Sequence, residues 1–331
     1  MTVQVVLVHG IRTSATMWRA QVAHLRERGN PVTAVDLPGH GTRRGEDFTL
    51  GEAFATIDRA VRDAATRGPV LLVGHSMGGL LSIEYVGRED PPPVAAFIAA
   101  SCTSVPRGVG LAAYRFLARR FDGLPDRGLG LTNIVLDRTL PPETREDFGA
   151  GGYAFDAQDT ALASLSVLDL LAALRRIDVP MWFVNGQWDQ LRVNEKLFTS
   201  IARDAELIVV PRTTHLVTAM RPRVFNALLD VALTTVEARL AWGDRVGAAF
   251  SGISLGSILL LVALGLAITY GLMGVINMAH GELMMIGAYA TYVVQGLFQK
   301  YLPGAFDWYL VAAVPVAFTA SALMGAALER S

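Results

Sequence analysis

Charged residues are almost absent from the last 86 residues of this 331-residue chain. The whole chain has 29 basic and 30 acidic residues, but from residue 246 onward it has only Glu282, Lys300, Asp307, Glu329 and Arg330. Residues 246–279 form a run of 34 without any charge. The first 245 residues have the composition of a soluble domain, whereas the remainder has the composition of a membrane protein.

The sequence is also poor in cysteine, in net charge and in secretion signals. A single cysteine, Cys102, excludes an internal disulfide framework and suits a reducing compartment, and we expect it to pack in the core. A net charge of −1 gives no indication of a nucleic-acid partner. The opening segment VQVVLVHG has a strand pattern without a basic region or a cleavage site, so the first domain is expected in the cytoplasm.

Short apolar runs alternate with amphipathic stretches over residues 1–240. The predicted strands are 3–8, 32–35, 70–73, 94–99, 181–184 and 207–210, and the predicted helices are 15–28, 50–67, 78–87, 194–203 and 223–240. This alternation predicts an α/β fold with a mostly parallel sheet covered on both faces. Residues 104–176 interrupt the pattern with helical periodicity and no convincing strand. They indicate a helical cap over an active site, or a surface excursion without a role.

The segment VLLVGHSMGG, residues 70–79, contains the pattern Gly-x-Ser-x-Gly around Ser76. An apolar strand precedes it and a helical stretch follows, which is the context of a nucleophile elbow. In such a turn the serine takes a strained conformation with its hydroxyl exposed, and glycines remove Cβ atoms that would clash. The pattern predicts that Ser76 is a nucleophile.

A serine hydroxyl needs a base, and the base needs a group that orients it. The histidine that follows the last predicted strand is His215, in VVPRTTHLVT. The acid is expected after the preceding strand, where MWFVNGQWDQL provides Asp189. The other histidines lie in turn motifs, a helix, a loop or the apolar tail: His9, His75, His24, His40 and His280. The chain order Ser76, Asp189, His215 is the one expected for this arrangement.

Backbone N–H groups are expected to stabilise the oxyanion of an acyl-transfer intermediate. We assign the N–H of Met77, directly after the nucleophile, and that of Ile11, with Arg12 as the alternative to Ile11. Further candidates for the substrate pocket lie in or near these motifs: His9, Gly10, Trp18, His75 and Trp188. No cofactor or metal is expected.

Residues 1–240 resemble the alpha/beta-hydrolase family. The resemblance rests on HGIRTSATMW, DLPGHG, GHSMGG, NGQWD and THL, which occur in the family's order. It implies acyl transfer to water from a small ester, thioester or amide. Because some hydroxynitrile lyases resemble this chain in starting directly at the His-Gly strand, a lyase with Lys196 near the pocket is an alternative. Four cap arginines could pair with an acidic substrate or form a solvated face: Arg107, Arg115, Arg119 and Arg120.

The tail predicts about three membrane-spanning helices, near 250–271, 275–295 and 308–328, within a segment that begins near residue 246. The second contains His280 and Glu282, which we expect either to have a function or to lie at the membrane interface. The third contains Pro315, and a proline is tolerated in a membrane helix. The segment 254–295 is similar to the start of the permease subunit of branched-chain amino acid and urea ABC transporters, most specifically in GLMGVINMAHGELMMIGAY. A family member has several further spans, so we expect the tail alone not to form a transport path.

The predicted organisation is a hydrolase domain at 1–240 with its cap at about 104–176, a linker at 241–245 and a permease-like segment at 246–331. Three hypotheses follow: a membrane-anchored hydrolase, a transport subunit with a fused hydrolase, or a reading frame that joins two unrelated genes. The expected partners are an ester-type substrate, a lipid bilayer and ABC transporter subunits. Arg239 and Arg245 beside the first span favour a hydrolase on the cytoplasmic side of the inner membrane.

Overall fold

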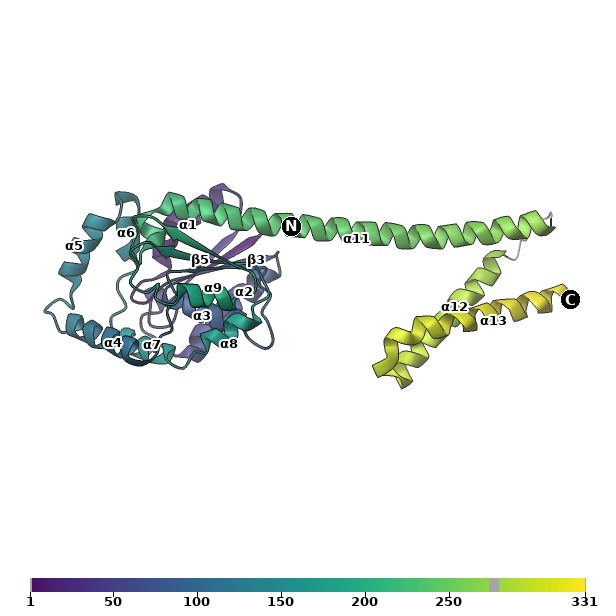
Figure 1. The fold of residues 1–331 in the computed structure, drawn as a ribbon, viewed down its shortest axis with the longest axis horizontal. Coiled ribbons are helices and arrows are strands. Elements are labelled where there is room, and N and C mark those ends of the chain that lie inside the picture. Colours follow the sequence, from purple (N-terminus) through teal and green to yellow (C-terminus); the bar gives the residue numbers. More distant parts are fainter. Residues whose placement is uncertain (1, 274–279, 331) are drawn as a thin grey trace. The chain divides into compact units, whose positions relative to one another are not determined.

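The computed structural model describes residues 2–273 and 280–330, and it divides into two compact units, Met1–Trp242 and Gly243–Ser331. The first unit is built on one sheet of six parallel strands in the order β2-β1-β3-β4-β5-β6 (Figure 1). The strands are β1 Gln4–Val8, β2 Val32–Val35, β3 Val70–His75, β4 Ala96–Ala100, β5 Met181–Gly186 and β6 Ala205–Val210. The carboxyl ends of parallel strands meet at one edge of a sheet, so the loops after β1, β3, β5 and β6 can share one site.

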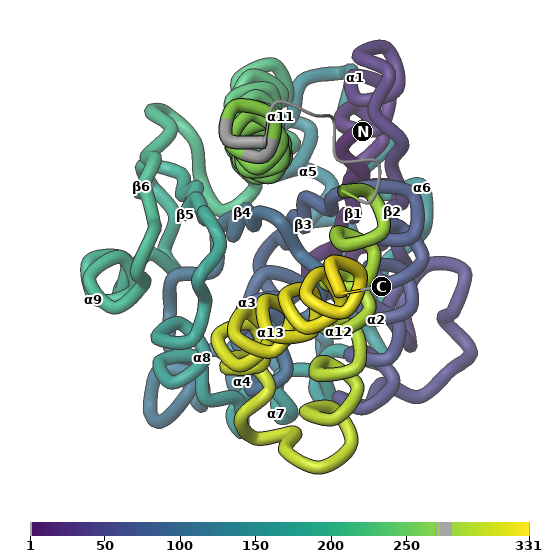
Figure 2. The backbone as a smooth tube through the Cα atoms, turned by 90° about the vertical axis from the view of Figure 1, so that its right-hand side faces the viewer, coloured from purple at the N-terminus to yellow at the C-terminus, as the bar shows by residue number. Residues whose placement is uncertain are grey.

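Helices cover both faces of this sheet, as Figure 2 shows. One face carries α1 (Arg19–Glu27) and the start of α11 (Pro222–Met273), and the other carries α2 (Leu50–Ala65), α3 (Met77–Val86) and α8 (Leu170–Arg176). Because β1, β3 and β4 are buried along their whole length, they read as continuous apolar runs rather than alternating ones.

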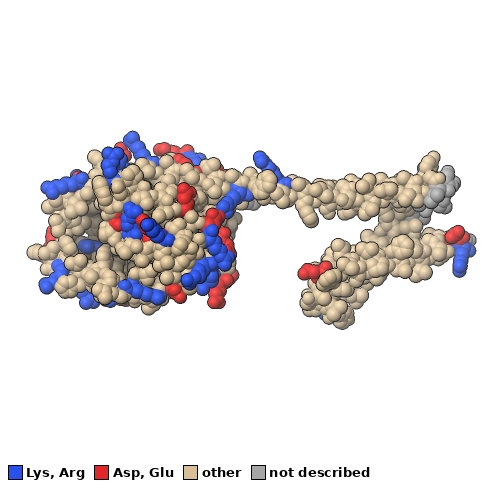
Figure 3. Space-filling view, viewed as in Figure 1, with Lys and Arg blue, Asp and Glu red and all other residues tan. Residues whose placement is uncertain are grey.

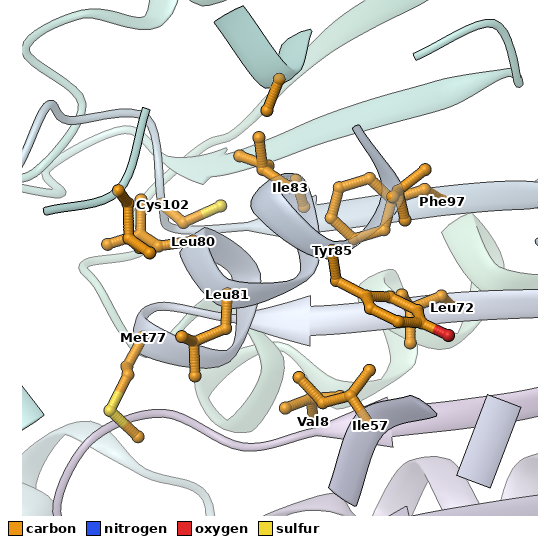
Figure 4. Packing of buried hydrophobic residues seen from close by; sticks show 14 of the residues in the cluster. Val8, Ile57, Leu72, Met77, Leu80, Leu81, Ile83, Tyr85, Phe97 and Cys102 are labelled. Carbon is orange, nitrogen blue, oxygen red and sulfur yellow. The ribbon is translucent and has the colours of Figure 1, made fainter. Parts of the chain in front are cut away.

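The helix after β3 is buried on nearly every side. Leu81, Ile83 and Tyr85 of α3 pack among side chains of β1, β3, β4 and α2 (Figure 4). Cys102 is 1% exposed and lies beside Leu80, and burial raises the pKa of its thiol. A buried thiol of this kind is inert, which agrees with a packing role.

The insertion between β4 and β5 is helical in all of its regular elements. It contains α4 (Gly108–Asp122), α5 (Leu129–Thr139), α6 (Pro142–Ala150), α7 (Gln158–Leu165) and α8. The last of these belongs to the covering layer of the sheet, because the guanidinium of Arg176 bonds the carbonyl of Gly87 after α3 and Leu174 is fully buried in the core. The remaining short elements of this unit are η1 Ala15–Trp18, η2 Gly41–Arg43, α9 Glu195–Ile201 and α10 Val217–Met220.

Helix α11 differs from the expected arrangement at residues 241–245. These residues, predicted as a linker, are helical, and α11 continues from Pro222 to Met273. The segment Ala-Trp-Gly-Asp-Arg has no proline, and one glycine costs a helix only about 1 kcal/mol. Composition changes at this point while the backbone conformation does not.

The second unit contains α12 (His280–Tyr301), η3 (Pro303–Trp308) and α13 (Tyr309–Arg330). Its α12 and α13 pack together, and the Ser321 hydroxyl donates to the Leu283 carbonyl at 3.0 Å. Among the described residues, two helical stretches are long and apolar enough to cross a membrane, Pro222–Ile268 and Pro303–Arg330. The start of the second expected span, 275–279, lies outside the described residues. Figure 3 shows that charged side chains cover the first unit and are sparse on the helices of the second.

Candidate active site

Ser76 occupies a strained turn between β3 and α3. Its backbone has φ 52° and ψ −119°, in a region that non-glycine residues rarely adopt. The flanking glycines allow the close approach that this turn needs. A Cβ on Gly74 would lie 2.6 Å from the carbonyl oxygen of Gly78, and one on Gly78 would lie 2.5 Å from the carbonyl oxygens of Val8 and His9. Close packing therefore requires glycine at both positions, and the surrounding backbone keeps Ser76 in its strained conformation.

Ser76, His215 and Asp189 form one hydrogen-bonded line, although they come from the ends of three different strands. His215 Nε2 lies 2.8 Å from Ser76 Oγ, and His215 Nδ1 lies 3.0 and 3.2 Å from the two carboxylate oxygens of Asp189. A carboxylate only accepts, so Nδ1–H is the donor to Asp189 and Nε2 is left to accept the Ser76 hydroxyl proton. This is the tautomer that a general base requires.

Asp189 is positioned by the loop after β5. Its side chain is fully buried against His215, and Oδ1 also accepts the N–H of Leu191 at 2.8 Å. Burial alone raises the pKa of this carboxyl, but the bonds from His215 and Leu191 outweigh it, and the pKa lies below its ordinary value. Asp189 is therefore ionised at neutral pH.

A buried polar network supports the same loop. Asn185 donates to the hydroxyl of Thr103 at 2.8 Å and to Glu195 at 3.1 Å, and Arg192 forms an ion pair with Glu195. The amide oxygen of Asn194 accepts the N–H of Val105. These bonds join the loops after β4 and β5, and sequence patterns contain no signal for them because the partners lie up to 89 residues apart.

Two of the predicted pocket residues, His9 and His75, are buried supports of neighbouring loops. His75 Nε2–H donates to the carbonyl of His215 at 2.9 Å, and burial, with the nearby His215, lowers the pKa of His75 to about 3. His9 bonds the Gly10 carbonyl at 2.7 Å and accepts the N–H of Leu37 at 3.0 Å. Burial lowers the pKa of His9 to about 3 as well, so both rings stay neutral.

The N–H groups of Ile11 and Met77 have no acceptor among the described residues. Met77 is the first residue of α3, so its N–H has no partner inside the helix. Ile11 lies in the turn after β1, and both residues line a cavity with Ser76. An oxyanion hole requires two free N–H donors near the nucleophile, and these two residues share a cavity with Ser76.

Two cavities meet at Ser76, Ile11 and Tyr114, which line both of them. The first, of about 310 Å³, has apolar walls from α3, α4, α7 and the loop after β5, including Leu80, Leu111 and Leu165. The second, of about 340 Å³, is lined by His215 and by residues of α5 and the loop after β1. The cap thus supplies much of the wall, and a residue that sequence reasoning missed, Tyr114 of α4, faces both cavities.

The structure brings only some of the predicted pocket residues to these cavities. Gly10 and His75 line the second one, whereas His9, Trp18 and Trp188 line neither. Trp18 is fully buried against Phe225 between α1 and α11, and Trp188 is 60% exposed. Trp18 therefore packs in the core and Trp188 faces solvent, although both are close in sequence to the motifs of the site.

Three of the four cap arginines are bonded within the cap. Arg115 and Arg119 both pair with Asp159, and Arg107 donates to main-chain carbonyls of residues 166 and 168. Arg120 lies over the ring of Phe116 at 5.4 Å. An acidic substrate would have to displace these contacts. Within residues 2–273 and 280–330 no group of three or more His, Cys, Asp or Glu side chains is arranged to hold a metal ion.

Comparison with known proteins identifies the family of this fold. Residues 5–228, two thirds of the chain, match the alpha/beta hydrolase family. The chain belongs to the alpha/beta hydrolase family. The resemblance and the fold class expected from the sequence are thereby confirmed. Residues 248–331 match the permease component of the branched-chain amino acid transport system, which confirms the resemblance of the tail.

Relatives of this hydrolase include the probable esterase PIR7A of Oryza sativa, which is 33% identical over 143 residues, 42% of this chain. That alignment covers 53% of the rice protein, so the chain spans about half the length of the curated relatives it matches. The tail is 47% identical over 45 residues to the permease LivH of Escherichia coli, covering 14% of this chain and 15% of that protein. A solved esterase of Thermogutta terrifontis shares the fold at TM-score 0.57 and 20% identity, covering 71% and 90% of the two chains.

Proposed function

We propose that this alpha/beta hydrolase cleaves a carboxylic ester, or a related thioester or amide, through an acyl-enzyme on Ser76. The observation that carries the proposal is the line of hydrogen bonds from Ser76 Oγ through His215 to the buried carboxylate of Asp189. A hydroxyl 2.8 Å from a correctly oriented imidazole has both the reach and the base that nucleophilic attack needs.

In the first half of the reaction, Ser76 Oγ bonds to the acyl carbon while His215 Nε2 takes its proton. The carbonyl oxygen becomes an oxyanion, which accepts the N–H groups of Ile11 and Met77. Asp189 stays ionised and stabilises the imidazolium through the Nδ1–H bond. His215 then gives its proton to the leaving group, whose bond to the acyl carbon breaks.

In the second half, water attacks the acyl carbon and His215 accepts a proton from it. Collapse of the second tetrahedral intermediate breaks the bond to Ser76 Oγ, which recovers its proton from His215, and the carboxylic acid leaves. The lyase alternative receives no support from the cavities, because Lys196 is exposed and lines neither of them.

We also propose that the tail, residues 246–331, holds the hydrolase at a membrane. The apolar stretch Pro222–Ile268 and the match to a transport permease support this placement. Arg239 and Arg245 precede the uncharged run that begins at residue 246, and basic residues at this end of a span favour the cytoplasmic side of the inner membrane. The permease match favours transporter subunits as partners, which co-purification with a matched permease and ATPase would test.

The catalytic proposal is tested by Ser76→Ala, measured with a small chromogenic ester on the full chain. We expect activity to fall to the background rate. Ser82→Ala is the matched control, because Ser82 lies on α3, is fully buried and has a hydroxyl without a partner among the described residues. Full activity in Ser76→Ala, or equal losses in both variants, would refute the assignment.

A further inference from the structure

Arg12, in the turn after β1, has a guanidinium that no acidic group contacts among the described residues. The residue is partly buried and lines the second cavity with Ser76 and His215. Among the described residues its guanidinium has no hydrogen bond or ion pair, and its one contact of this kind is the ring of Phe155, 4.4 Å away. A partly buried cation without an anionic partner is costly, so the site favours an anion that arrives with a ligand.

The backbone of Arg12 is unusual as well. Its φ of 64° lies in the left-handed region, where a long side chain is rarely found. Arg12 directly follows Ile11 in the turn after β1, and both residues line the second cavity. Strain of this kind persists where surrounding structure maintains it, and it is concentrated at ligand sites.

Asp122 attracts Arg12 but does not form an ion pair with it. Burial lowers the pKa of the guanidinium, and attraction to Asp122 opposes that shift from a distance. Asp122 forms no ion pair with Arg12: its Oδ2 accepts a bond from Gln158 at 3.0 Å, and its Oδ1 is buried without a partner among the described residues. Arg127 repels Arg12 and forms its own ion pair with Asp156 at 2.7 Å.

The side of the nucleophile on which Arg12 lies identifies the part of the substrate that it would meet. The general acid must reach the heteroatom of the leaving group. His215 lines the second cavity and not the first. The leaving group therefore belongs in the second cavity with His215 and Arg12, which leaves the first cavity for the acyl chain. Both cavities have largely apolar walls, so the position of His215 makes this assignment.

We infer that this enzyme prefers esters with an apolar acyl chain and a leaving group that carries an anion, a carboxylate or a phosphate, which Arg12 binds. A guanidinium offers two parallel N–H donors to either group. The inference rests on the proposed function, because it assumes attack by Ser76 on an ester placed across both cavities.

The test uses the full-length chain in detergent and two esters of matched size. One is the butyrate ester of a nitrophenol that bears a ring carboxylate, and the other is that of the corresponding carboxamide. The readout is the ratio of kcat/KM for the charged ester to that for the neutral ester. We expect Arg12→Gln to lower this ratio by roughly 10- to 100-fold, the effect of losing a hydrogen-bonded charge pair. Arg12→Lys is expected to retain part of the preference.

Arg127→Gln is the matched control. Arg127 lies over the same Phe155 ring at 4.7 Å and also has a left-handed backbone, with φ 56°, but it lines neither cavity. Because Arg127 acts on the site only through its charge near Arg12, the ratio should change far less in this variant than in Arg12→Gln. A parallel pair, the butyrate esters of glycerol phosphate and of glycerol, distinguishes the two anions, because the pair with the larger loss in Arg12→Gln identifies the preferred group.

The inference is overturned if the wild-type ratio is close to one in both pairs, or if Arg12→Gln loses activity equally on charged and neutral esters. The second result would show that Arg12 supports the fold through Phe155 or Asp122. Ser76→Ala is measured on the neutral esters in the same series. Activity that persists in that variant refutes the catalytic proposal, whereas activity that depends on Ser76 without an anion preference refutes only the role of Arg12.

Discussion

Replacing Asp189 by asparagine should leave the fold intact and remove most of the activity. The two side chains have nearly the same shape, and an asparagine oxygen could still accept the N–H of Leu191, now 2.8 Å from the carboxylate. The amide NH₂ would then face His215 Nδ1, which would have to become an acceptor. The ring proton would move to Nε2, so His215 could no longer accept the proton of Ser76.

The size of the effect follows from this change of tautomer. In triads of this kind an aspartate-to-asparagine exchange lowers kcat by about 10⁴-fold, which corresponds to about 5 kcal/mol of transition-state stabilisation. The assay is kcat for a chromogenic ester, with the unfolding midpoint of each variant measured in parallel. We expect the midpoint of Asp189→Asn to change little, because no atom is lost from the buried site.

A second His–Asp pair provides the control. His24 Nε2 lies 3.0 Å from Asp230 on the surface of the hydrolase unit, outside both cavities. Asp230→Asn should keep wild-type kcat and lose at most about 1 kcal/mol of stability, because exposed pairs contribute little. An Asp189→Asn variant within tenfold of wild-type kcat would contradict the assigned orientation of His215.

Three further predictions follow from the same contacts. Lowering the pH from about 7 to about 5 should cost about 2 kcal/mol of folding stability for each of His9 and His75, whose folded-state pKa of about 3 lies below the unfolded value of 6.5. Between pH 7 and pH 5 the unfolded state binds more protons than the folded state, so the free energy of unfolding decreases as the pH is lowered. A free energy from urea unfolding that does not depend on pH would contradict this. Gly78→Ala should destabilise the chain by about 2 kcal/mol or more, because its Cβ would meet two carbonyl oxygens of the backbone. Gly51→Ala, in open space on α2, should not, and similar melting temperatures would refute the clash. A chain ending at Trp242, where the first compact unit ends, should hydrolyse esters in solution without detergent, and an insoluble or inactive product would show that the unit needs the tail.

Local sequence patterns were sufficient to predict the strand, turn and helix around Ser76. The apolar strand, the strained serine and the glycines on either side are neighbours in sequence, so one short motif contains the whole turn. Asp189 and His215 could be assigned because the carboxyl ends of parallel strands meet at one edge of the sheet. Their catalytic roles stay predictions, since geometry places the three groups together without measuring a rate.

Features that depend on distant partners could not be predicted. The periodicity of residues 104–176 indicated a helical cap, but nothing in it showed that Tyr114 faces both cavities or that Arg115 pairs with Asp159, 44 residues away. The sequence indicated Arg12 only as an alternative N–H donor to Ile11. Its left-handed backbone and unpaired guanidinium could not be predicted, because they depend on the turn and the cap together. The boundary expected at 241–245 followed a change in composition, which does not require a helix to end.

The most direct test of the account is the covalent state of Ser76 during turnover. The full chain is mixed with a slowly hydrolysed ester, quenched in acid, digested and analysed by mass spectrometry. We predict a peptide that carries the acyl group on Ser76, and no such adduct in Ser76→Ala. An enzyme that hydrolyses the ester while Ser76 remains unmodified, with the acyl group on another side chain or on none, would contradict the account.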